Sequence, residues 1–266
     1  MKKIVLFLFF FGMLSSCEEV VEVDLNTAEP RLVIEANINR LEDGTANSTV
    51  KLTTTAPFFD NQIPVVPDAS VTITDDNGNT FPFIYAGDGI YQSNLVPEFD
   101  VNYTIEIIYE GESYTATQQL QSVPPLEFVE QRNDGGFSGE DIELKVYFTD
   151  PVGEGDYYFF EGLSEKGNDL DTFFDEFFDG NQIFGFFLIE DLEAGDEVIF
   201  NLYGVDEQFY NFMFVLLQQS TDQSSGPFQT QPATVRGNII NQTAIDNFPL
   251  GYFRVSEIST IVYIVE

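Results

Sequence analysis

Histidine is absent from this sequence, and cysteine occurs only once among the 266 residues. Without histidine, the chain cannot build a Ser-His-Asp or Cys-His nucleophile system, a histidine general base or an imidazole metal site. With one cysteine it cannot form an internal disulfide, so an exported form must be stabilised by its hydrophobic core. The 28 phenylalanines and 12 tyrosines can supply that core, and they favour β-strands.

Positive charge is scarce as well. Lysine and arginine number 10 against 45 aspartates and glutamates, which gives a formal net charge of −35. A surface of this sign repels nucleic acids and anionic lipid headgroups. We therefore expect no nucleic-acid partner, and any attachment to a membrane must come from acyl chains buried in the bilayer.

The start of the chain has the layout of a bacterial lipoprotein leader. Two lysines precede an apolar run at residues 4–14, which is too short to span a bilayer. Residues 14–17 read Leu-Ser-Ser-Cys and resemble a lipobox, in which the cysteine is acylated and becomes the mature N-terminus. We predict a signal peptide at 1–16 and lipidation of Cys17. The alternative is an ordinary cleaved signal with an incidental cysteine.

Residues 17–30 are predicted to form an acidic, extended tether. Two glutamates follow the cysteine directly and resemble the acidic export signal of some Bacteroidota lipoproteins. A solvated leash explains the same residues, because high charge with low hydrophobicity disfavours packing. We expect a protein that is lipid-anchored in the outer membrane. Display on the cell surface is preferred over a position on the periplasmic face of that membrane.

Residues 31–122 show short alternating segments punctuated by turns. About seven strands recur at spacings near ten residues, and Asn77-Gly78 marks the most explicit hairpin. This pattern predicts an N-terminal β-sandwich of immunoglobulin-like or prealbumin-like type. Two consecutive prolines at 124–125 then mark a domain boundary.

Residues 126–266 are predicted to form a second β-rich domain that carries one buried α-helix, so the fold class is mainly β. The helix is expected at about 206–220, where Asp206 can act as its N-cap and no glycine or proline interrupts it. Its broad apolar face favours packing against a sheet over lying in a membrane interface, since it lacks lysine and arginine. Two closing strands are predicted at 251–257 and 259–266.

The acidic, phenylalanine-rich segment 171–187 is the candidate partner or ligand surface. Four of its phenylalanines recur at helical spacing, which predicts one or two helical turns that stop at Gly180. Exposed aromatic side chains in one patch would mark an interaction surface. The alternative is a loop that covers the core with its phenylalanines pointing inward. The candidate residues are Phe173, Phe174, Phe177 and Phe178.

Two motifs resemble chemical sites but are better explained by structure. Residues 75–79 (DDNGN) resemble the start of a calcium loop, yet Thr80 and Ala86 stand where an EF-hand needs glycine and glutamate. A type I′ hairpin turn explains them. Residues 48–51 have Ser-x-x-Lys spacing, but strand alternation places the serine and the lysine on opposite faces. We predict no catalytic residues, no metal site and no cofactor.

Several motifs follow one another along the chain: the lipobox, the acidic tether, EPRLVIEANI (29–38), DPVGEGDYYFF (150–160), DEFFDG (175–180), DEQFYNFM (206–213), GPFQTQPATVRGNI (226–239) and GYF (251–253). Their order and spacing resemble the Bacteroidota outer-membrane lipoprotein family catalogued as domain of unknown function 4249. Read from the residues alone, Asp150-Pro151 with Gly153 and Gly155 predicts a turn that redirects the chain between two strands. The resemblance covers essentially the whole mature chain and implies no known catalytic residues. It also implies a gene that often lies beside that of a TonB-dependent receptor.

The expected function is therefore that of a non-catalytic outer-membrane lipoprotein, an accessory or ligand-capturing partner of a TonB-dependent receptor. A surface adhesin or structural envelope lipoprotein is the first alternative, and co-purification with a receptor would distinguish the two. A carboxylate-dependent hydrolase is the second alternative, which a tight cluster of buried acids in a cleft would support.

Overall fold

The structure is a computed structural model, and it describes residues 29–57, 62–136, 139, 141–220 and 234–266. The predicted signal peptide, Cys17, almost all of the tether at 17–30 and the loop at 221–232 lie outside the described residues. Among the residues described, no helix is long and apolar enough to cross a membrane.

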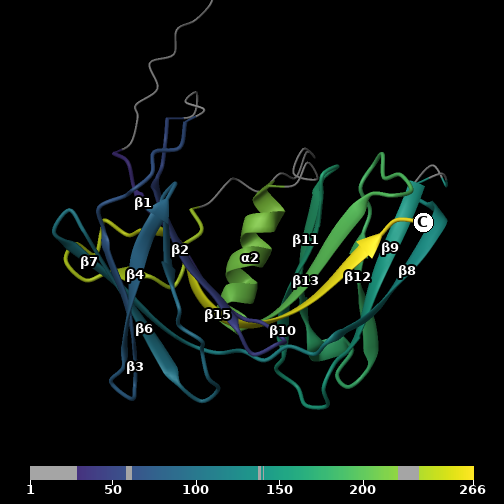
Figure 1. Ribbon diagram of the computed structural model, residues 1–266, viewed down its shortest axis with the longest axis horizontal. Coiled ribbons are helices and arrows are strands. Elements are labelled where there is room, and N and C mark those ends of the chain that lie inside the picture. The colour runs from purple at the N-terminus through teal and green to yellow at the C-terminus, as the bar shows by residue number, and fades with distance from the viewer. Residues whose placement is uncertain (1–28, 58–61, 137–138, 140, 221–233) are drawn as a thin grey trace, which may run out of the picture.

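The chain is built mainly from β-strands, arranged in two lobes with a helix between them (Figure 1). One sheet has twelve strands in the order β11-β10-β13-β15-β1-β2-β5-β4-β3-β6-β7-β14, and a second has three in the order β12-β9-β8. The strands are β1 Leu32–Arg40, β2 Ala46–Thr54, β3 Ser70–Asp75, β4 Thr80–Gly87, β5 Ile90–Ser93, β6 Asn102–Tyr109, β7 Glu112–Gln119, β8 Leu126–Gly135, β9 Asp141–Thr149, β10 Tyr157–Ser164, β11 Asn168–Phe174, β12 Gln182–Phe187, β13 Glu197–Val205, β14 Ile240–Asn241 and β15 Leu250–Ile264.

The N-terminal lobe contains β1 to β7, which confirms the predicted sandwich of about seven short strands. Its strands alternate buried and exposed residues, as in β6, whose Tyr103, Ile105 and Ile107 point inward. Side chains from β1 and β2 meet those from β3, β6 and β7 in one largely aliphatic core. The long sheet thus curls over its own apolar face.

The hairpin between β3 and β4 is confirmed, but its turn is not of type I′. Asp75 pairs with Asn79 through the backbone, and only Gly78, at φ 86°, has a positive φ in the three-residue loop. The Asp75 carboxylate accepts hydrogen bonds from the Asn79 backbone N–H and from its side-chain amide, both at 2.7 Å. These bonds hold the pKa of Asp75 below its ordinary value, and they explain the acidic residues as turn chemistry.

The C-terminal lobe is a second two-layer packing with an aromatic core. The sheet β12-β9-β8 contributes Phe148 and Phe187, and β10 and β13 contribute Phe160 and Phe200 from the facing sheet. The Phe187 and Phe200 rings lie edge to face at 5.5 Å between centroids. Phenylalanine side chains therefore fill the core of this lobe, whereas mainly aliphatic side chains fill the core of the N-terminal lobe.

One strand, β15, joins the lobes, where two closing strands were predicted. Its first half pairs with β1 in parallel and its second half with β13 antiparallel. Phe253 and Val255 therefore pack in the N-terminal core, so the predicted division at 126–266 is wrong for this segment. Gly251, at φ 92°, is required beside β1 because a Cβ there would overlap the Ile34 carbonyl. Long-range pairing of this kind has no local sequence signal.

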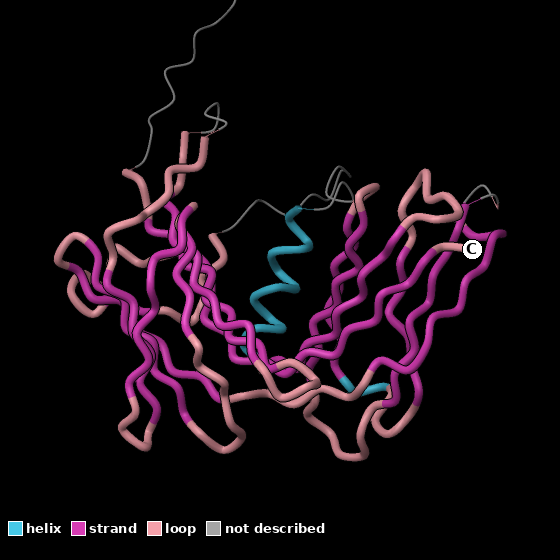
Figure 2. The backbone as a smooth tube through the Cα atoms, in the orientation of Figure 1, coloured by secondary structure: helices cyan, strands magenta, loops and turns pink. Residues whose placement is uncertain are grey.

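The predicted helix is confirmed as α2 (Glu207–Ser220), which stands on the concave side between the lobes (Figure 2). Asp206 caps it, since its carboxylate accepts the Phe209 backbone N–H at 2.6 Å. Phe209 and Met213 are buried, but Phe214 and Leu216 are 45% and 40% exposed. The helix thus buries one face only.

The helical turns predicted in the phenylalanine-rich segment are largely wrong. Phe173 and Phe174 end the strand β11, and only Asp175–Phe177 form a short 3-10 helix, η2. β11 is an edge strand of the large sheet. An edge strand can turn acidic side chains to solvent, which explains why a segment too acidic for a central strand still joins the sheet.

Candidate functional site

A cavity of about 640 Å³ lies between helix α2 and the sheet, and we call it the α2 cavity. Its helix wall is apolar except for Gln219, and the other walls come from strands β1, β10, β11 and β15 and from Thr234 and Val235. The volume falls within the range typical of small-molecule sites. The α2 side chains that line it are Phe209, Phe212, Met213, Leu216 and Gln219.

The charged groups in the α2 cavity come from the strands, while Gln219 of α2 and Thr234 add neutral polar groups. Arg254 lies on β15, Glu161 on β10, and Glu35 and Asn37 on β1. Because side chains of a strand alternate between its faces, Arg254 points to the α2 side while Phe253 and Val255 point into the N-terminal core. One strand thus supplies both the core of a lobe and the only cation described in this cavity.

Arg254 is a buried cation with few partners. Its side chain is 7% exposed, and its Nε and Nη1 atoms have no hydrogen-bond acceptor among the described residues. The remaining nitrogen, Nη2, donates to the Asn39 Oδ1 atom at 3.5 Å, the limit of a hydrogen bond. Within the part of the chain described, no carboxylate forms an ion pair with it at 4.0 Å or less.

Aromatic rings surround the guanidinium instead of acids. Its central carbon lies 4.0 Å from the centroid of the Tyr203 ring, 5.2 Å from that of Phe209 and 5.7 Å from that of Phe159. Burial lowers the pKa of Arg254, and the nearby Tyr203 and Glu161 act against that effect. An arginine stays charged even so. Cation–π contacts therefore stabilise the charge without using its N–H donors.

Glu161 is the acid that acts electrostatically on Arg254, but its carboxylate already accepts hydrogen bonds from other side chains. Its Oε2 accepts the Tyr203 hydroxyl at 2.8 Å and the Asn201 amide at 3.5 Å. Burial raises the pKa of Tyr203, and the Glu161 carboxylate raises it further, so the phenol stays protonated and donates. The carboxylate is thus bonded to two side chains of β13, and it forms no ion pair with the guanidinium within 4.0 Å among the described residues.

A cluster of three aspartates, two of them buried and Asp179 exposed, was not predicted from the sequence. Carboxylate oxygens of Asp150, Asp175 and Asp179 lie within 4.8 Å of one another, an arrangement that could hold a metal ion. Asp150 and Asp175 are 2% and 4% exposed. We call these three residues the aspartate cluster.

The fold itself supplies hydrogen-bond donors to the aspartate cluster. Asp150 accepts the Tyr158 hydroxyl at 2.6 Å and the Gly180 N–H at 3.0 Å. Asp175 accepts the Gly155 N–H, and Asp179 accepts the Gly153 N–H, both at 2.7 Å. The motifs at 150–160 and 175–180 are thus joined in one turn structure, as the predicted turn chemistry of the first motif requires.

The four candidate phenylalanines do not form one surface. Phe173 and Phe178 are partly buried against the C-terminal core, and Phe174 stacks near Tyr157. Phe177 alone is widely exposed, at 84%, with its ring edge on Phe174. Phe173 and Phe178 therefore point inward, as the core-covering alternative predicts, while Phe177 in the same segment is exposed.

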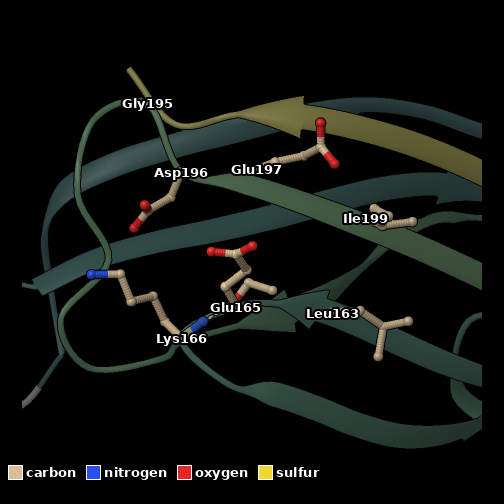
Figure 3. A pocket seen from close by; sticks show the side chains of 8 residues that line it. Leu163, Glu165, Lys166, Gly195, Asp196, Glu197 and Ile199 are labelled. Atoms are coloured by element: carbon tan, nitrogen blue, oxygen red, sulfur yellow. Dashed lines mark hydrogen bonds between the residues drawn. The ribbon is translucent and has the colours of Figure 1, made fainter.

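A second hollow, of about 540 Å³, lies where the β10–β11 turn approaches the start of β13 (Figure 3). Glu165, Lys166 and Glu197 are exposed charged side chains at its rim, and Asp196 is half-buried. These groups are solvated. Unlike the α2 cavity, this hollow has no buried cation among the described residues that line it.

Ser48 and Lys51 are also confirmed as separate. The Ser48 hydroxyl is buried and donates to the Leu95 carbonyl at 2.6 Å, while Lys51 faces Glu35 at 3.8 Å on the other side of β2. The two residues therefore share no site.

A comparison with protein-family models matches residues 18–261 to the family described as "Domain of unknown function (DUF4249)". The chain belongs to this family. The match spans almost all of the residues that carry the resemblance in sequence, and it includes both lobes, α2 and the aspartate cluster. No curated protein matches the chain.

Several solved structures are similar at low identity. A two-domain fibronectin type-III segment from chicken tenascin is 16% identical, with 67% of this chain and 92% of that chain covered and a TM-score of 0.22. A cytokine receptor complex is 12% identical, with 66% and 84% covered and a TM-score of 0.25. A tetra-tandem repeat of a large adhesion protein is 16% identical, with 67% and 46% covered and a TM-score of 0.21.

Sequence reasoning missed Arg254 and the α2 cavity. One signal was present: a lone arginine inside the apolar strand pattern GYFRVSE (251–257), in a chain with ten basic residues in all. A charged residue at an inward position of a strand is rarely buried without a pair. The opposing walls come from β1, β10 and α2, and no local pattern indicates that they converge on it.

Proposed function

We propose that this chain is a non-catalytic outer-membrane lipoprotein, anchored through acyl chains on Cys17, that captures a small ligand for a TonB-dependent receptor. The observation that carries the ligand-capturing part is the α2 cavity with its buried, unpartnered Arg254 donors. A site with convergent apolar walls and few polar groups is the usual form of a small-molecule site.

The membrane and receptor parts of this proposal are supported by the sequence. The lipobox-like residues 14–17 supply an anchor, and the family resemblance carries the association with a receptor gene. Tethering raises the local concentration of a binding module at the mouth of a transporter, so a weak ligand site is sufficient for capture.

We propose a binding role over a hydrolytic one because of how the buried acids are used. The aspartate cluster accepts hydrogen bonds from backbone N–H groups and the Tyr158 hydroxyl. It lines neither the α2 cavity nor the hollow at Glu165. Its oxygens are thus used in joining two turns, whereas hydrolysis needs carboxylates that face a substrate cleft.

The test is a pull-down of the tagged full-length protein from detergent-solubilised outer membrane, with Cys17→Ala as the control for anchoring. We expect stoichiometric recovery of a TonB-dependent receptor with the parent chain and its loss with Cys17→Ala. Recovery of the lipoprotein alone, from membranes in which the receptor is present, would contradict the accessory role and favour the adhesin or structural alternative.

A variant sharpens this experiment. Phe177→Ser removes the exposed aromatic side chain of the candidate partner surface, and the control Phe128→Ser removes an exposed ring outside that segment, on β8 of the small sheet, where it is 47% exposed. If Phe177 contacts the receptor, only the first variant weakens recovery. Equal recovery with both variants would exclude Phe177 from the interface.

A further inference from the structure

The buried guanidinium of Arg254 is the starting point, because it lines the α2 cavity and two of its nitrogens have no acceptor in the described residues. Leaving a buried donor unpaired is costly, and the cost is larger for a charged group. The surrounding rings stabilise the positive charge but accept no conventional hydrogen bond from Nε or Nη1. The arrangement is complete only when an acceptor enters the cavity.

We propose that the α2 cavity binds a small apolar molecule that carries one carboxylate, and that Arg254 binds this carboxylate. The inference deepens the proposed ligand-capturing function and rests on it. A planar carboxylate matches the planar donors of a guanidinium, and such charge-assisted hydrogen bonds are among the strongest in proteins.

The charge of the cavity limits the ligand to a single negative charge. Glu35 and Glu161 line the same space as Arg254, and Glu161 is fixed there by the Tyr203 hydroxyl. Glu35 is paired with Lys51 at 3.8 Å, which leaves Arg254 and Glu161 as one positive and one negative charge in the cavity. A monocarboxylate adds one negative charge to this set, whereas a doubly charged phosphate would add two and be repelled more strongly by both glutamates. A positively charged ligand would leave the arginine donors unpaired.

The remaining walls define the body of the ligand. Phe212, Met213 and Leu216 of α2 face Val33 and Leu250 of the sheet across the cavity. Leu216 is 40% exposed in a helix whose other face is packed, so an apolar ligand would cover it. A short aliphatic or aromatic chain fits these walls because it buries apolar area without needing further polar partners.

The test measures binding of three probes that differ only in their polar end: 4-phenylbutyrate, 4-phenylbutan-1-ol and 4-phenylbutylammonium. The acylated full-length protein is held in phospholipid nanodiscs, and isothermal titration calorimetry is corrected with empty nanodiscs. We expect one carboxylate probe to bind per chain, about tenfold more tightly than the alcohol, with the weakest binding for the ammonium probe.

Three variants assign the effect to residues. Arg254→Met keeps the volume of the cavity and should remove the preference for carboxylate over alcohol while the alcohol still binds. Arg132→Met, at an exposed arginine paired with Asp134 on β8, is the matched control and should change neither affinity. Leu216→Trp fills the cavity from the helix and should weaken all three probes.

The outcomes separate this inference from the proposed function. If the alcohol binds as tightly as the carboxylate, and Leu216→Trp weakens both, the cavity captures ligands but Arg254 does not select them; the inference is then wrong and the function stands. If Arg254→Met leaves the carboxylate preference intact, the inference is equally wrong. If no probe binds to the parent chain, both the inference and the ligand-capturing function lose their support. Retained alcohol binding by Arg254→Met also shows that this variant is folded.

Discussion

Two buried charged groups lie on opposite sides of the sheet that β10 and β13 share, and they differ in how their hydrogen bonds are completed. The aspartate cluster packs several acids together, yet backbone N–H groups and a tyrosine hydroxyl donate to them. Arg254 is a single cation whose Nε and Nη1 atoms find no acceptor in the described residues. The fold itself therefore supplies hydrogen-bond donors to the aspartate cluster, whereas it leaves two nitrogens of Arg254 without an acceptor among the described residues.

The difference follows from what surrounds each group. The cluster lies in turns, where backbone donors are not used by a ladder, and Gly153 and Gly155 adopt positive φ angles while their N–H groups donate to the carboxylates. Arg254 lies in the middle of β15, whose backbone groups pair with β1. Among the described residues its guanidinium lies against aromatic rings and the Asn39 amide, and its Nε and Nη1 atoms have no acceptor. A buried charge in a turn can therefore be structural, while one facing a cavity wall of rings indicates a ligand.

The largest change in stability is expected when an aspartate of the hydrogen-bonded cluster is removed. Asp150→Ala leaves the Tyr158 hydroxyl and the Gly180 N–H buried without their acceptor, so the free energy of unfolding should fall by about 3 kcal/mol. Urea denaturation measures the change. Asp76→Ala is the control: this exposed carboxylate also accepts two bonds, from Asn102, and should cost less than about 1 kcal/mol. Equal losses would show that the cluster is no more structural than a surface turn.

Replacing Arg254, whose hydrogen bonds are incomplete, should raise the free energy of unfolding or leave it almost unchanged. Arg254→Met removes a buried cation that forms no ion pair among the described residues, so no acid is left without its partner. The flexible apolar chain of methionine packs among the same rings. Because apolar replacement of buried charge is often neutral or stabilising, we expect a change between about zero and a gain of 2 kcal/mol in unfolding free energy. Urea denaturation without added ligand is the measurement. A loss as large as that of Asp150→Ala would mean that the guanidinium is already satisfied, and the contrast between the two groups would disappear.

The sequence predicts one of these two groups much better than the other. The turn residues Asp150, Gly153 and Gly155 carry a local signal, and α2 could be located from Asp206 and its apolar face. Their partner Asp175 could not be identified, because the contact joins a turn to a segment twenty residues further on. The same holds for β15, whose pairing with β1 spans most of the chain and sets the position of Arg254. Periodicity shows which face of a strand is buried, but it does not show which strand lies beside it.

The smallest expected effect tests whether the hydrogen bonds donated to the aspartate cluster fully compensate the repulsion among its carboxylates. Asp156 lies beside it, and burial together with repulsion from Asp150, Asp175 and Asp179 raises the pKa of its carboxyl above the ordinary 3.8. The folded state therefore holds this proton more tightly than the unfolded state does, so the contribution of Asp156 to stability is present below pH 3.8 and is lost as the pH rises through the raised pKa.

Asp156→Asn removes this ionisation. The variant should be more stable than the parent at pH 7 by less than about 1 kcal/mol, since solvent screens a partly exposed carboxylate, and the advantage should vanish near pH 3.5. Urea denaturation of both proteins across this range measures the difference. A gain that is the same at both ends would assign the effect to packing of the amide instead of charge. A gain confined to neutral pH would show that the backbone donors satisfy three aspartates but leave a residual repulsion on the fourth, which is the limit of what the turns at 150–156 and 175–180 can compensate.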